Sequence, residues 1–477
     1  MVCLFLFPLV SLPAQELFSD KDLQEAHRLA LNLQPEKALQ KITDDSFVES
    51  AYIASLAEAV ELLVTEDESK FDEYEDRFLD RLERNFKGSV RDYQFLQAEI
   101  RLQWAFVYLK FGHELDAALR LRQAYMIVES CKEKFPDYVA IRKTSGLLQV
   151  IIGSVPDKYR RVFSLLNMTG SVRTGLAELN EVSLTDSPLA LESKILFSLI
   201  EGFILTRPES ALEHMQQILA VEKGNRLLLF LSASFALKNA QNELALEMLD
   251  GLSTSGSGVP LYYADYLRGE AYLRKADYLN SISAFRWFIK HQTGHNYIKD
   301  AYYKIGLCYL LNGNENDALA IFDEARDMGK ETTEADRSAA HSLAEKDLPN
   351  VKLSKVRHLT DGGYFKEAET VLSTIKTSEL VIKRDQVEYY YRKARLAHKM
   401  AKPDVVDLYM ETITRTGQDN WYFAPNACLQ LGYIYLSQNK TKEAEEYFQR
   451  ALSYRRHEYK NSIDSKARSA LAQLGRI

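Results

Sequence analysis

Cysteine is scarce in this chain, which has four among its 477 residues. Cys3 lies in an apolar stretch at the start, which leaves Cys131, Cys308 and Cys428. An odd and scattered set of this kind does not form a disulfide framework, even in an oxidising compartment. We therefore expect the three later cysteines to be small, buried packing residues.

Proline, glycine and long hydrophobic runs are also sparse, with 11 Pro and 21 Gly in the chain. Few residues therefore interrupt helices, and no segment has the composition of a long disordered linker. Alternation of apolar and polar residues over the length of a strand is rare. The later apolar run "GLLQVIIGSV" is short, and "SKILFSLIEGFILT" contains Glu201. Composition thus predicts an all-α fold without a transmembrane span.

The chain has no strong excess of one charge, because 60 basic and 67 acidic residues are interspersed and give a net charge of −7. A broad basic face is therefore not expected, and we predict no nucleic-acid partner. Gly256 and Gly258 are not followed by the Lys and hydroxyl residue of a phosphate loop. His291 and His295 lie in a glycine-containing connector without the acidic partner of a zinc-enzyme motif. We predict no metal site, no cofactor and no enzymatic activity.

What the chain does contain is a spaced pattern of small and large residues, clearest in "DAYYKIGLCYLLNGNENDALAIFDEAR" from Asp300 to Arg326. Two antiparallel helices pack closely where small residues let the backbones approach and large residues fill the adjacent space. Gly306 and Ala318 are expected at this crossing, Phe322 beside it, and Gly313 in the turn. The spacing resembles a tetratricopeptide repeat, a helical hairpin, with Gly306 at position 8.

The same pattern recurs around Gly269 and Gly432, and weaker copies fill the intervals from residue 189 to residue 452. One hairpin cannot bury its apolar face alone, so the units are expected to stack. The usual proline at position 32 is missing, which predicts irregular connectors. The resemblance implies an all-α, tetratricopeptide-type solenoid that forms a right-handed superhelix. We expect an irregular helical region over 15–187 and an array over 188–477, with "IDSKARSALAQLGRI" as its capping helix.

The segment from Gly146 to Leu179 has a distinct layout, in which a helix ends at Ser and Pro, a second helix follows, and a glycine-bounded turn leads into a third. It resembles the inclusion-body clearance family of tetratricopeptide proteins through Gly146, Ser154, Pro156, Leu165, Gly170 and Gly175. That resemblance implies a solenoid with an irregular middle. Pro156 can open the second helix, whose Lys158, Arg160 and Arg161 form a basic side. Buried packing is expected for its apolar side, and a peripheral membrane or partner contact is the alternative.

Residues 1–14, "MVCLFLFPLVSLPA", are apolar and uncharged and are followed at once by a polar segment. This run is too short to span a bilayer, but it matches the core of a signal peptide with Ala14 at the cleavage edge, although a positive n-region is missing. We therefore expect export, to the periplasm or the outer membrane. The alternative is a buried helix in a cytoplasmic protein.

The first helix of each unit is expected to line the concave wall of the array with positions 2, 5, 9, 12 and 13. These positions are rich in aromatic and long apolar residues, whereas a clamp for a terminal carboxylate would need lysines and asparagines. We therefore predict a non-enzymatic scaffold that grips a protein segment. Its predicted contacts are Tyr263, Tyr266, Glu270, Tyr303, Leu307, Leu310, Tyr391, Arg395 and Tyr433. The alternatives are a structural subunit of a cell-envelope assembly and a glycan-binding accessory protein.

Overall fold

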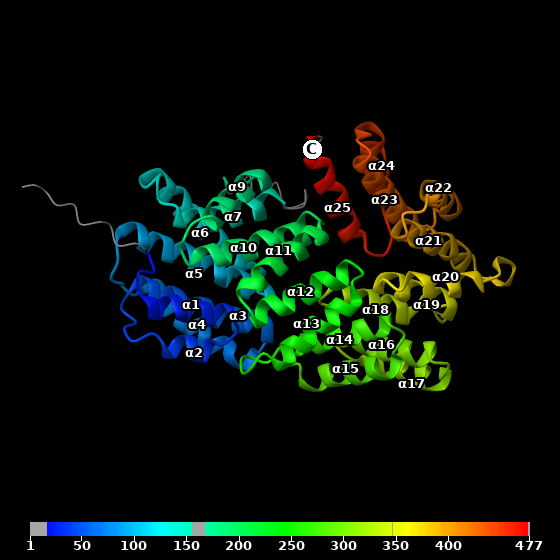
Figure 1. Ribbon diagram of the computed structural model, residues 1–477, viewed down its shortest axis with the longest axis horizontal. Coiled ribbons are helices and arrows are strands. Elements are labelled where there is room, and N and C mark those ends of the chain that lie inside the picture. Colours follow the sequence, from blue (N-terminus) through cyan, green and yellow to red (C-terminus); the bar gives the residue numbers. More distant parts are fainter. Residues whose placement is uncertain (1–16, 155–166, 346, 476–477) are drawn as a thin grey trace, which may run out of the picture.

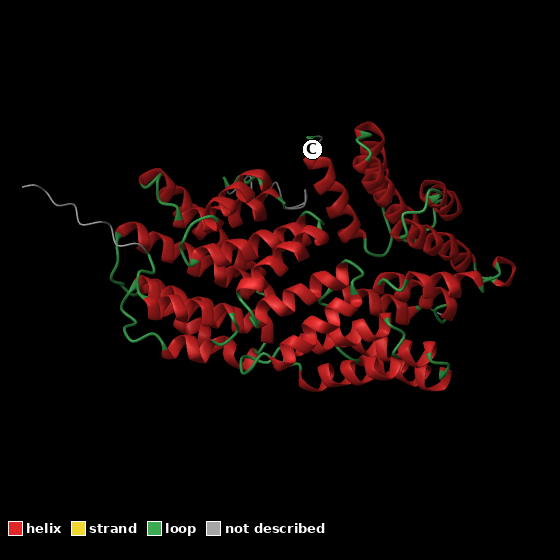
Figure 2. Cartoon of the chain, viewed as in Figure 1, coloured by secondary structure: helices red, strands yellow, loops and turns green. Residues whose placement is uncertain are grey.

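A computed structural model describes residues 17–154, 167–345 and 347–475, and this part of the chain is helical without a strand (Figures 1 and 2). The signal-like segment with Ala14, and the basic helix expected after Pro156, lie outside the described residues. The first half contains α1 (Lys21–Leu31), α2 (Pro35–Gln40), α3 (Val48–Thr65), α4 (Glu68–Glu83), α5 (Val90–Lys110), α6 (Glu114–Lys134), α7 (Ala140–Gly153) and α9 (Val172–Ser183).

The second half begins with α10 (Leu189–Leu199), which continues into the π-helical turn η1 (Ile200–Ile204). Helical hairpins follow, and they are interrupted by the single helix α18 and by the short 3-10 turn η2 (Thr377–Glu379). The remaining helices are α11 (Pro208–Val221), α12 (Arg226–Lys238), α13 (Asn242–Thr254), α14 (Tyr262–Arg274), α15 (Tyr278–His291), α16 (Ile298–Leu311), α17 (Glu315–Asp327), α18 (Glu334–Ala344), α19 (Val351–Gly362), α20 (Phe365–Ser373), α21 (Lys383–Lys399), α22 (Val405–Thr416), α23 (Phe423–Ser437), α24 (Thr441–Ser453) and α25 (Lys460–Gln473).

The spacing of small residues predicted the hairpins correctly. A Cβ placed on Gly306 of α16 would lie 2.6 Å from the ring of Phe322 in α17, so the glycine is required by close helix packing. Gly269 and Gly432 meet Phe285 and Phe448 in the same way. The turn residue Gly313 has a φ of 90°, in the left-handed region that glycine adopts without strain.

The glycines at the middle of the chain also mark a helix crossing. A Cβ on Gly146 of α7 would lie 2.8 Å from the carbonyl oxygen of Gly175 in α9, and one on Gly175 would lie 2.4 Å from the carbonyl oxygen of Gly146. Backbones this close leave no room for a side chain on either helix. Gly146 and Gly175 therefore have a packing role here.

The amino-terminal helices bury a chain of charged and polar side chains. Lys143 of α7 donates to Glu99 of α5 at 2.8 Å, to Glu192 of α10 at 2.7 Å and to the Tyr52 hydroxyl of α3 at 2.8 Å. Glu192 also accepts from Tyr52 and pairs with His27 of α1. All five side chains are almost fully buried. The network therefore joins five helices through buried charged and polar groups that serve as one another's hydrogen-bond and ion-pair partners.

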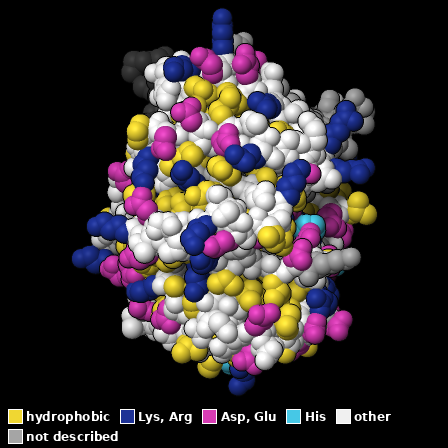
Figure 3. All heavy atoms as spheres, turned by 90° about the vertical axis from the view of Figure 1, so that its right-hand side faces the viewer, with side chains coloured by type: hydrophobic (Ala, Val, Ile, Leu, Met, Phe, Trp, Pro, Cys, Tyr) yellow, Lys and Arg dark blue, Asp and Glu magenta, His cyan; other side chains and the backbone are white. Residues whose placement is uncertain are grey.

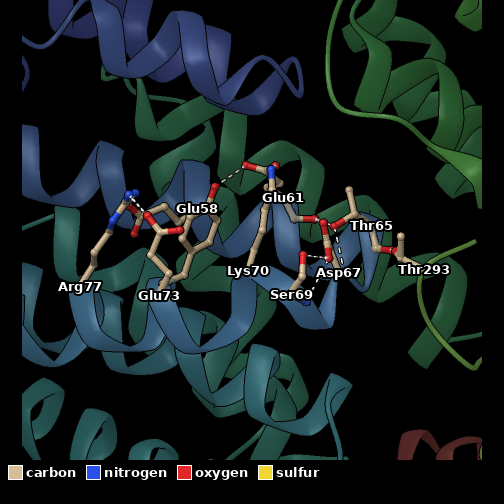
Figure 4. A network of polar contacts seen from close by, with 10 residues as sticks. Glu58, Glu61, Thr65, Asp67, Ser69, Lys70, Glu73, Arg77 and Thr293 are labelled. Carbon is tan, nitrogen blue, oxygen red and sulfur yellow. Dashed lines mark hydrogen bonds and ion pairs between the residues drawn. The ribbon is translucent and has the colours of Figure 1, made fainter.

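Connectors of the array dock on the ends of the amino-terminal helices. Val259 N donates to Leu33 O at 2.8 Å, and Thr293 Oγ1 donates to Thr65 O at 2.8 Å (Figure 4). Asn296 Nδ2 donates to Glu66 at 2.8 Å. Glu66 caps α3 in a left-handed conformation and is buried, because the α15–α16 connector covers it.

Buried carboxylates of α3 also join it to α4. Glu58 of α3 is 1% exposed and accepts hydrogen bonds from Arg77 (Figure 4) and from Arg81 of α4. Glu61 accepts from Lys70 at 2.5 Å and from the Tyr74 hydroxyl. These carboxylates therefore hold two helices together, each with its charge paired.

The last described helix, α25, packs on the hairpin that precedes it. In α25, Ile463, Ala467, Ala470 and Leu471 are buried against the last hairpin, α23–α24. The far edge of this unit returns to the middle of the chain, where Tyr433 lies 3.2 Å from Thr206 and Arg207 donates to Gln473 at 3.2 Å. We call this junction of α23 and α25 with η1 and α11 the closure seam. It brings residues more than 200 positions apart into contact.

Candidate functional site

Helix α19 packs against two helices of the array, α12 and α14, which the sequence predicted as part of a binding wall. A Cβ on Gly362, at the end of α19, would lie 2.9 Å from Cβ of Arg274 in α14. A Cβ on Gly363 would lie 2.1 Å from the carbonyl oxygen of Ala240, after α12. Tyr364 then donates to Glu243 of α13 at 2.7 Å. The chain thus folds its own helix onto the inner ends of α12 and α14.

Tyr266 was expected to be partly exposed at the wall, but it is 4% exposed. Its hydroxyl donates to Asp300 of α16 at 2.6 Å and accepts from Lys304 at 2.7 Å. Its ring packs between Tyr263 at 5.1 Å and Phe288 at 5.5 Å. The ring therefore belongs to the core between two units, because a tyrosine whose hydroxyl is paired loses little when it is buried.

Three further predicted contacts are also enclosed. Leu307 and Leu310 are 4% and 6% exposed and lie in the same core as Tyr266. Tyr391 is 3% exposed, with its ring 5.2 Å from Phe423 and 5.5 Å from Tyr422. In this conformation none of the three offers appreciable surface to a partner, since neighbouring units cover them.

The other five predicted residues are half-buried: Tyr263, Glu270, Tyr303, Arg395 and Tyr433. Tyr303 of α16 stacks on Phe322 at 5.5 Å, and Tyr433 of α23 reaches the closure seam. The Arg395 side chain of α21 is 22% exposed and lies 3.9 Å from Asp361 of α19. These five side chains are partly accessible to solvent, whereas the other four lie in the core.

Charged groups on the concave side neutralise one another in part. Burial disfavours the charged form of Glu270, but Lys304 and Arg274 outweigh burial and lower its pKa to about 2. The pKa of His358 on α19 falls to about 3, because the imidazole is buried and faces Arg357. His358 is therefore neutral near pH 7, beside a carboxylate that is ionised.

Three ionisable residues of α19 were not predicted from the sequence: Arg357, His358 and Asp361. The spacing within the repeat unit could have identified two of them. With Ala368 at position 20, Arg357 falls at position 9 and Asp361 at position 13 of that unit. Both positions had been assigned to the concave wall in the other units. They were missed because this unit matches the repeat pattern less closely than the units around Gly269, Gly306 and Gly432.

The described residues hold no group of three or more His, Cys, Asp or Glu side chains that could bind a metal ion. Cys131, Cys308 and Cys428 are free and buried, as expected of packing residues. Burial raises the pKa of their thiols, to about 11 for Cys131 and about 12 for the other two. Within the same ranges, no helix has the length and apolar character needed to cross a membrane.

Two parts of the chain match models of the tetratricopeptide repeat, residues 266–331 and residues 425–458. They cover most or all of the hairpins built around Gly269, Gly306 and Gly432. The chain therefore contains tetratricopeptide repeats, and its all-helical architecture is a solenoid of that type. No curated protein matches the chain.

The chain is similar to several solved structures at low identity. A human IFIT1 dimer with PPP-AAAA is 14% identical, with 92% of this chain and 95% of the other covered and a TM-score of 0.34. Yeast Tom70 is 11% identical, with 95% and 86% covered and a TM-score of 0.33. The tetratricopeptide domain of P58(IPK) is 15% identical, with 78% and 99% covered and a TM-score of 0.21. These similarities concern the fold alone.

Proposed function

We propose that this protein is a non-enzymatic scaffold that holds a segment of another protein on the concave side of its repeat array. Tetratricopeptide repeats generally mediate protein–protein interaction, and this chain has them over 266–331 and 425–458. The observation that carries the proposal is the row of half-buried side chains on that side, Tyr263, Glu270, Tyr303, Arg395 and Tyr433. Half-buried aromatic and arginine side chains on a rigid support are typical anchors for a partner.

Fewer of the predicted contact residues are accessible than the sequence suggested, so the proposed contact surface is smaller. Tyr266, Leu307, Leu310 and Tyr391 act as support, since each is less than 9% exposed. Contacts with a partner would concentrate at Tyr303 of α16, Arg395 of α21 and Tyr433 of α23, which remain partly exposed. A segment held there would meet aromatic rings and one guanidinium group.

Photo-crosslinking tests this proposal at a single position. We would replace Tyr433 by a benzophenone amino acid and, as a matched control, replace Tyr389 on the side of α21 that packs with α20. The expected result is a covalent adduct with one protein at position 433 that is absent at position 389. The adduct should disappear when Arg395→Ala is combined with the label, while circular dichroism shows unchanged helix content.

Two results would contradict the proposal. Equal labelling at both positions would show non-specific capture. Intramolecular crosslinks alone at position 433, in the cells that express the protein, would show that the edge is closed by the chain itself.

We further propose export of the protein and a relationship to the inclusion-body clearance family. Export is supported by the apolar run of residues 1–14, and N-terminal sequencing of the protein from cell fractions tests it. An intact Met1 in cytoplasmic material would contradict export. The family relationship is supported by the residues shared between Gly146 and Gly175, two of which mark the crossing of α7 and α9.

A further inference from the structure

A cavity of about 900 Å³ lies between α1 and the first helices of the array. Its lining comes from α1, from the turn between α9 and α10, and from α10 and α11. Two lining residues form an ion pair between these elements, since Arg28 of α1 lies 2.7 Å from Glu222 at the end of α11. Cavities of about 300–1,000 Å³ typically hold small molecules. The volume of this cavity is therefore suited to a small ligand.

His27 of α1 lines the cavity, and its side chain is fully buried. Its Nε2 lies 2.5 Å from a carboxylate oxygen of Glu192, whereas no described residue offers a hydrogen-bond partner to Nδ1. Burial alone would raise the pKa of Glu192, but Lys143 and His27 lower it below its usual range, so the carboxylate is ionised. Nε2 therefore donates to it, and Nδ1 of the neutral imidazole is left as an acceptor. A ligand hydroxyl group could supply the missing donor.

A second histidine lines the cavity from α11. His214 Nδ1 lies 2.7 Å from Glu201 of η1, whose side chain is buried, and its ring lies 5.9 Å from that of Phe197 of α10. The contact with Glu201 occupies Nδ1 and leaves Nε2 free. A buried carboxylate thus orients each of the two histidines, as supporting carboxylates orient histidines that bind ligands in other proteins.

Apolar side chains form much of the remaining lining. Leu191 and Phe197 of α10 and Ile218 of α11 are half-buried, so part of each remains uncovered. Val221, at the end of α11, is 77% exposed and adds apolar surface to the same cavity. Covering apolar surface is favourable, so a ligand with an apolar body would gain free energy here.

The charged side chains of the lining leave a small excess of positive charge. Three are basic and three are acidic: Lys21, Arg28, Lys194, Glu25, Asp186 and Glu222. Arg28 pairs with Glu222, and Glu25 pairs at 2.8 Å with Lys41, which does not line the cavity. Within the described ranges, the other three form no ion pair. Two lysines and one aspartate are therefore unpaired, and together they favour an anion.

This preference for an anion is local. Over the face of the molecule seen in Figure 3, basic and acidic side chains are interspersed, and the whole chain carries a net charge of −7. A protein of this composition does not attract anions over its surface as a whole. Saturable binding of a carboxylate would therefore indicate a defined site.

We propose that this cavity binds a small carboxylic acid that has an apolar body and a hydroxyl group. The apolar body lies on Leu191, Phe197 and Ile218. The carboxylate lies near Lys21 and Lys194, which are exposed at the mouth of the cavity, and the hydroxyl group donates to Nδ1 of the buried His27. Since the lining comes from α1 on one side and from α10 and α11 on the other, the bound ligand joins the first helix to the array. This site is separate from the concave side proposed to hold a protein segment.

Titration calorimetry on the full chain tests the proposal with two matched acids, ω-hydroxydodecanoate and dodecanoate. They share the apolar chain and the carboxylate and differ in the hydroxyl group. We expect one-to-one binding of both acids by the wild type. The affinity for dodecanoate should be lower by about fivefold or more, because it leaves the buried nitrogen of His27 without a donor.

Variants assign the two polar contacts. Lys21→Gln/Lys194→Gln should weaken the binding of both acids by about fivefold or more, since it removes both unpaired cations. The matched control, Lys330→Gln/Lys442→Gln, makes the same change of charge on exposed lysines elsewhere and should bind both acids as the wild type does. His27→Phe keeps an aromatic ring beside Phe18 and should bind the two acids equally. Because both acids are compared on the wild type, the test does not depend on the folding of His27→Phe.

Hydrogen exchange locates the binding site. The bound ω-hydroxydodecanoate should protect backbone amides of α1 and α11 and leave those of α16 and α23 unchanged. Protection of α16 and α23 instead would place the acid on the concave side of the array and would overturn the proposal.

Three further results would also overturn it. The first is no saturable binding of either acid by the wild type, and the second is equal affinity of the wild type for the two acids. The third is unchanged affinity in Lys21→Gln/Lys194→Gln. A hydroxyl-dependent affinity in the wild type, weakened in the lysine variant and retained in its control, supports the proposal.

Discussion

Replacing Lys143 by methionine should destabilise the amino-terminal half more than any other single change of charge there. Lys143 is 3% exposed and its ammonium is the one cation between Glu99 and Glu192, at 2.8 and 2.7 Å. Lys143→Met keeps the length of the side chain but leaves buried Glu99 without a cation and leaves Glu192 with only His27 and Tyr52 as partners. Breaking a buried ion pair from one side costs about 3–5 kcal/mol.

The decrease in the free energy of unfolding caused by Lys143→Met should depend on pH, because the carboxylates that lose the lysine are buried. Burial already raises the pKa of Glu99 in the wild type, and removal of Lys143 raises it further. A carboxyl group whose pKa is higher in the folded state contributes stability at low pH and loses it as pH rises through that pKa. The deficit of Lys143→Met relative to the wild type should therefore be largest near pH 8 and should shrink as the pH falls toward 5.

Urea unfolding followed by tryptophan fluorescence can measure the change in the free energy of unfolding in the amino-terminal core. The chain has three tryptophans, and Trp104 is fully buried against Phe78 in the amino-terminal core at 4.6 Å. With Trp287→Phe and Trp421→Phe as background, the signal reports on that core alone. The control is Lys132→Met, since Lys132 is 33% exposed and its ion pair with Glu178 is therefore more accessible to water than that of Lys143.

The control should lose less than about 1 kcal/mol, because surface ion pairs contribute little. Adding Glu99→Gln and Glu192→Gln to Lys143→Met should recover part of the lost stability, since it removes both carboxylate charges that lose the lysine. The reasoning fails if Lys143→Met and Lys132→Met cost the same and neither deficit changes with pH.

Three further predictions concern the array. Gly306→Leu should cost about 1–3 kcal/mol or more and lower the melting temperature clearly more than Tyr303→Ala, since a side chain at 306 would enter the ring of Phe322. The unfolded chain accepts a proton on His358 near pH 6.5, whereas the folded protein does so only near pH 3, so the wild type loses stability as the pH falls between these values. His358→Asn should reduce this loss. A melting temperature that falls with pH as steeply in the variant as in the wild type would contradict the prediction. The buried thiols, Cys308 included, should react with a thiol reagent only after urea is added, and rapid labelling of the native protein would refute their burial.

The repeat hairpins were predictable from the sequence because their packing is local. Gly306 meets Phe322 only 16 positions later, and this relation returns at Gly269 and at Gly432. Small residues at a fixed distance from aromatic ones therefore specify a hairpin without any knowledge of the rest of the chain. The capping helix follows from the same kind of information, since its buried residues all lie on one face of a 3.6-residue period.

The solvent exposure of the predicted contact residues could not be predicted in the same way. Position within a unit indicates which way Tyr266 points, but it does not indicate what covers that side. Tyr266 is covered by Phe288 of α15 and by Asp300 and Lys304 of α16, so its burial depends on how two successive units pack against each other. A tyrosine in a wall and a tyrosine in a core have the same local sequence, which is why its exposure was predicted wrongly.

The sequence by itself therefore determined the helical class, the register of the hairpins and the cap, because each depends on contacts within one or two units. The tertiary structure decided which charges are buried and where the solenoid closes. His27 and Glu192 are 165 positions apart, and Thr206 and Tyr433 are 227 positions apart. Contacts of this range leave no spacing pattern in the chain, since they depend on how the accumulated curvature of many units brings distant helices together.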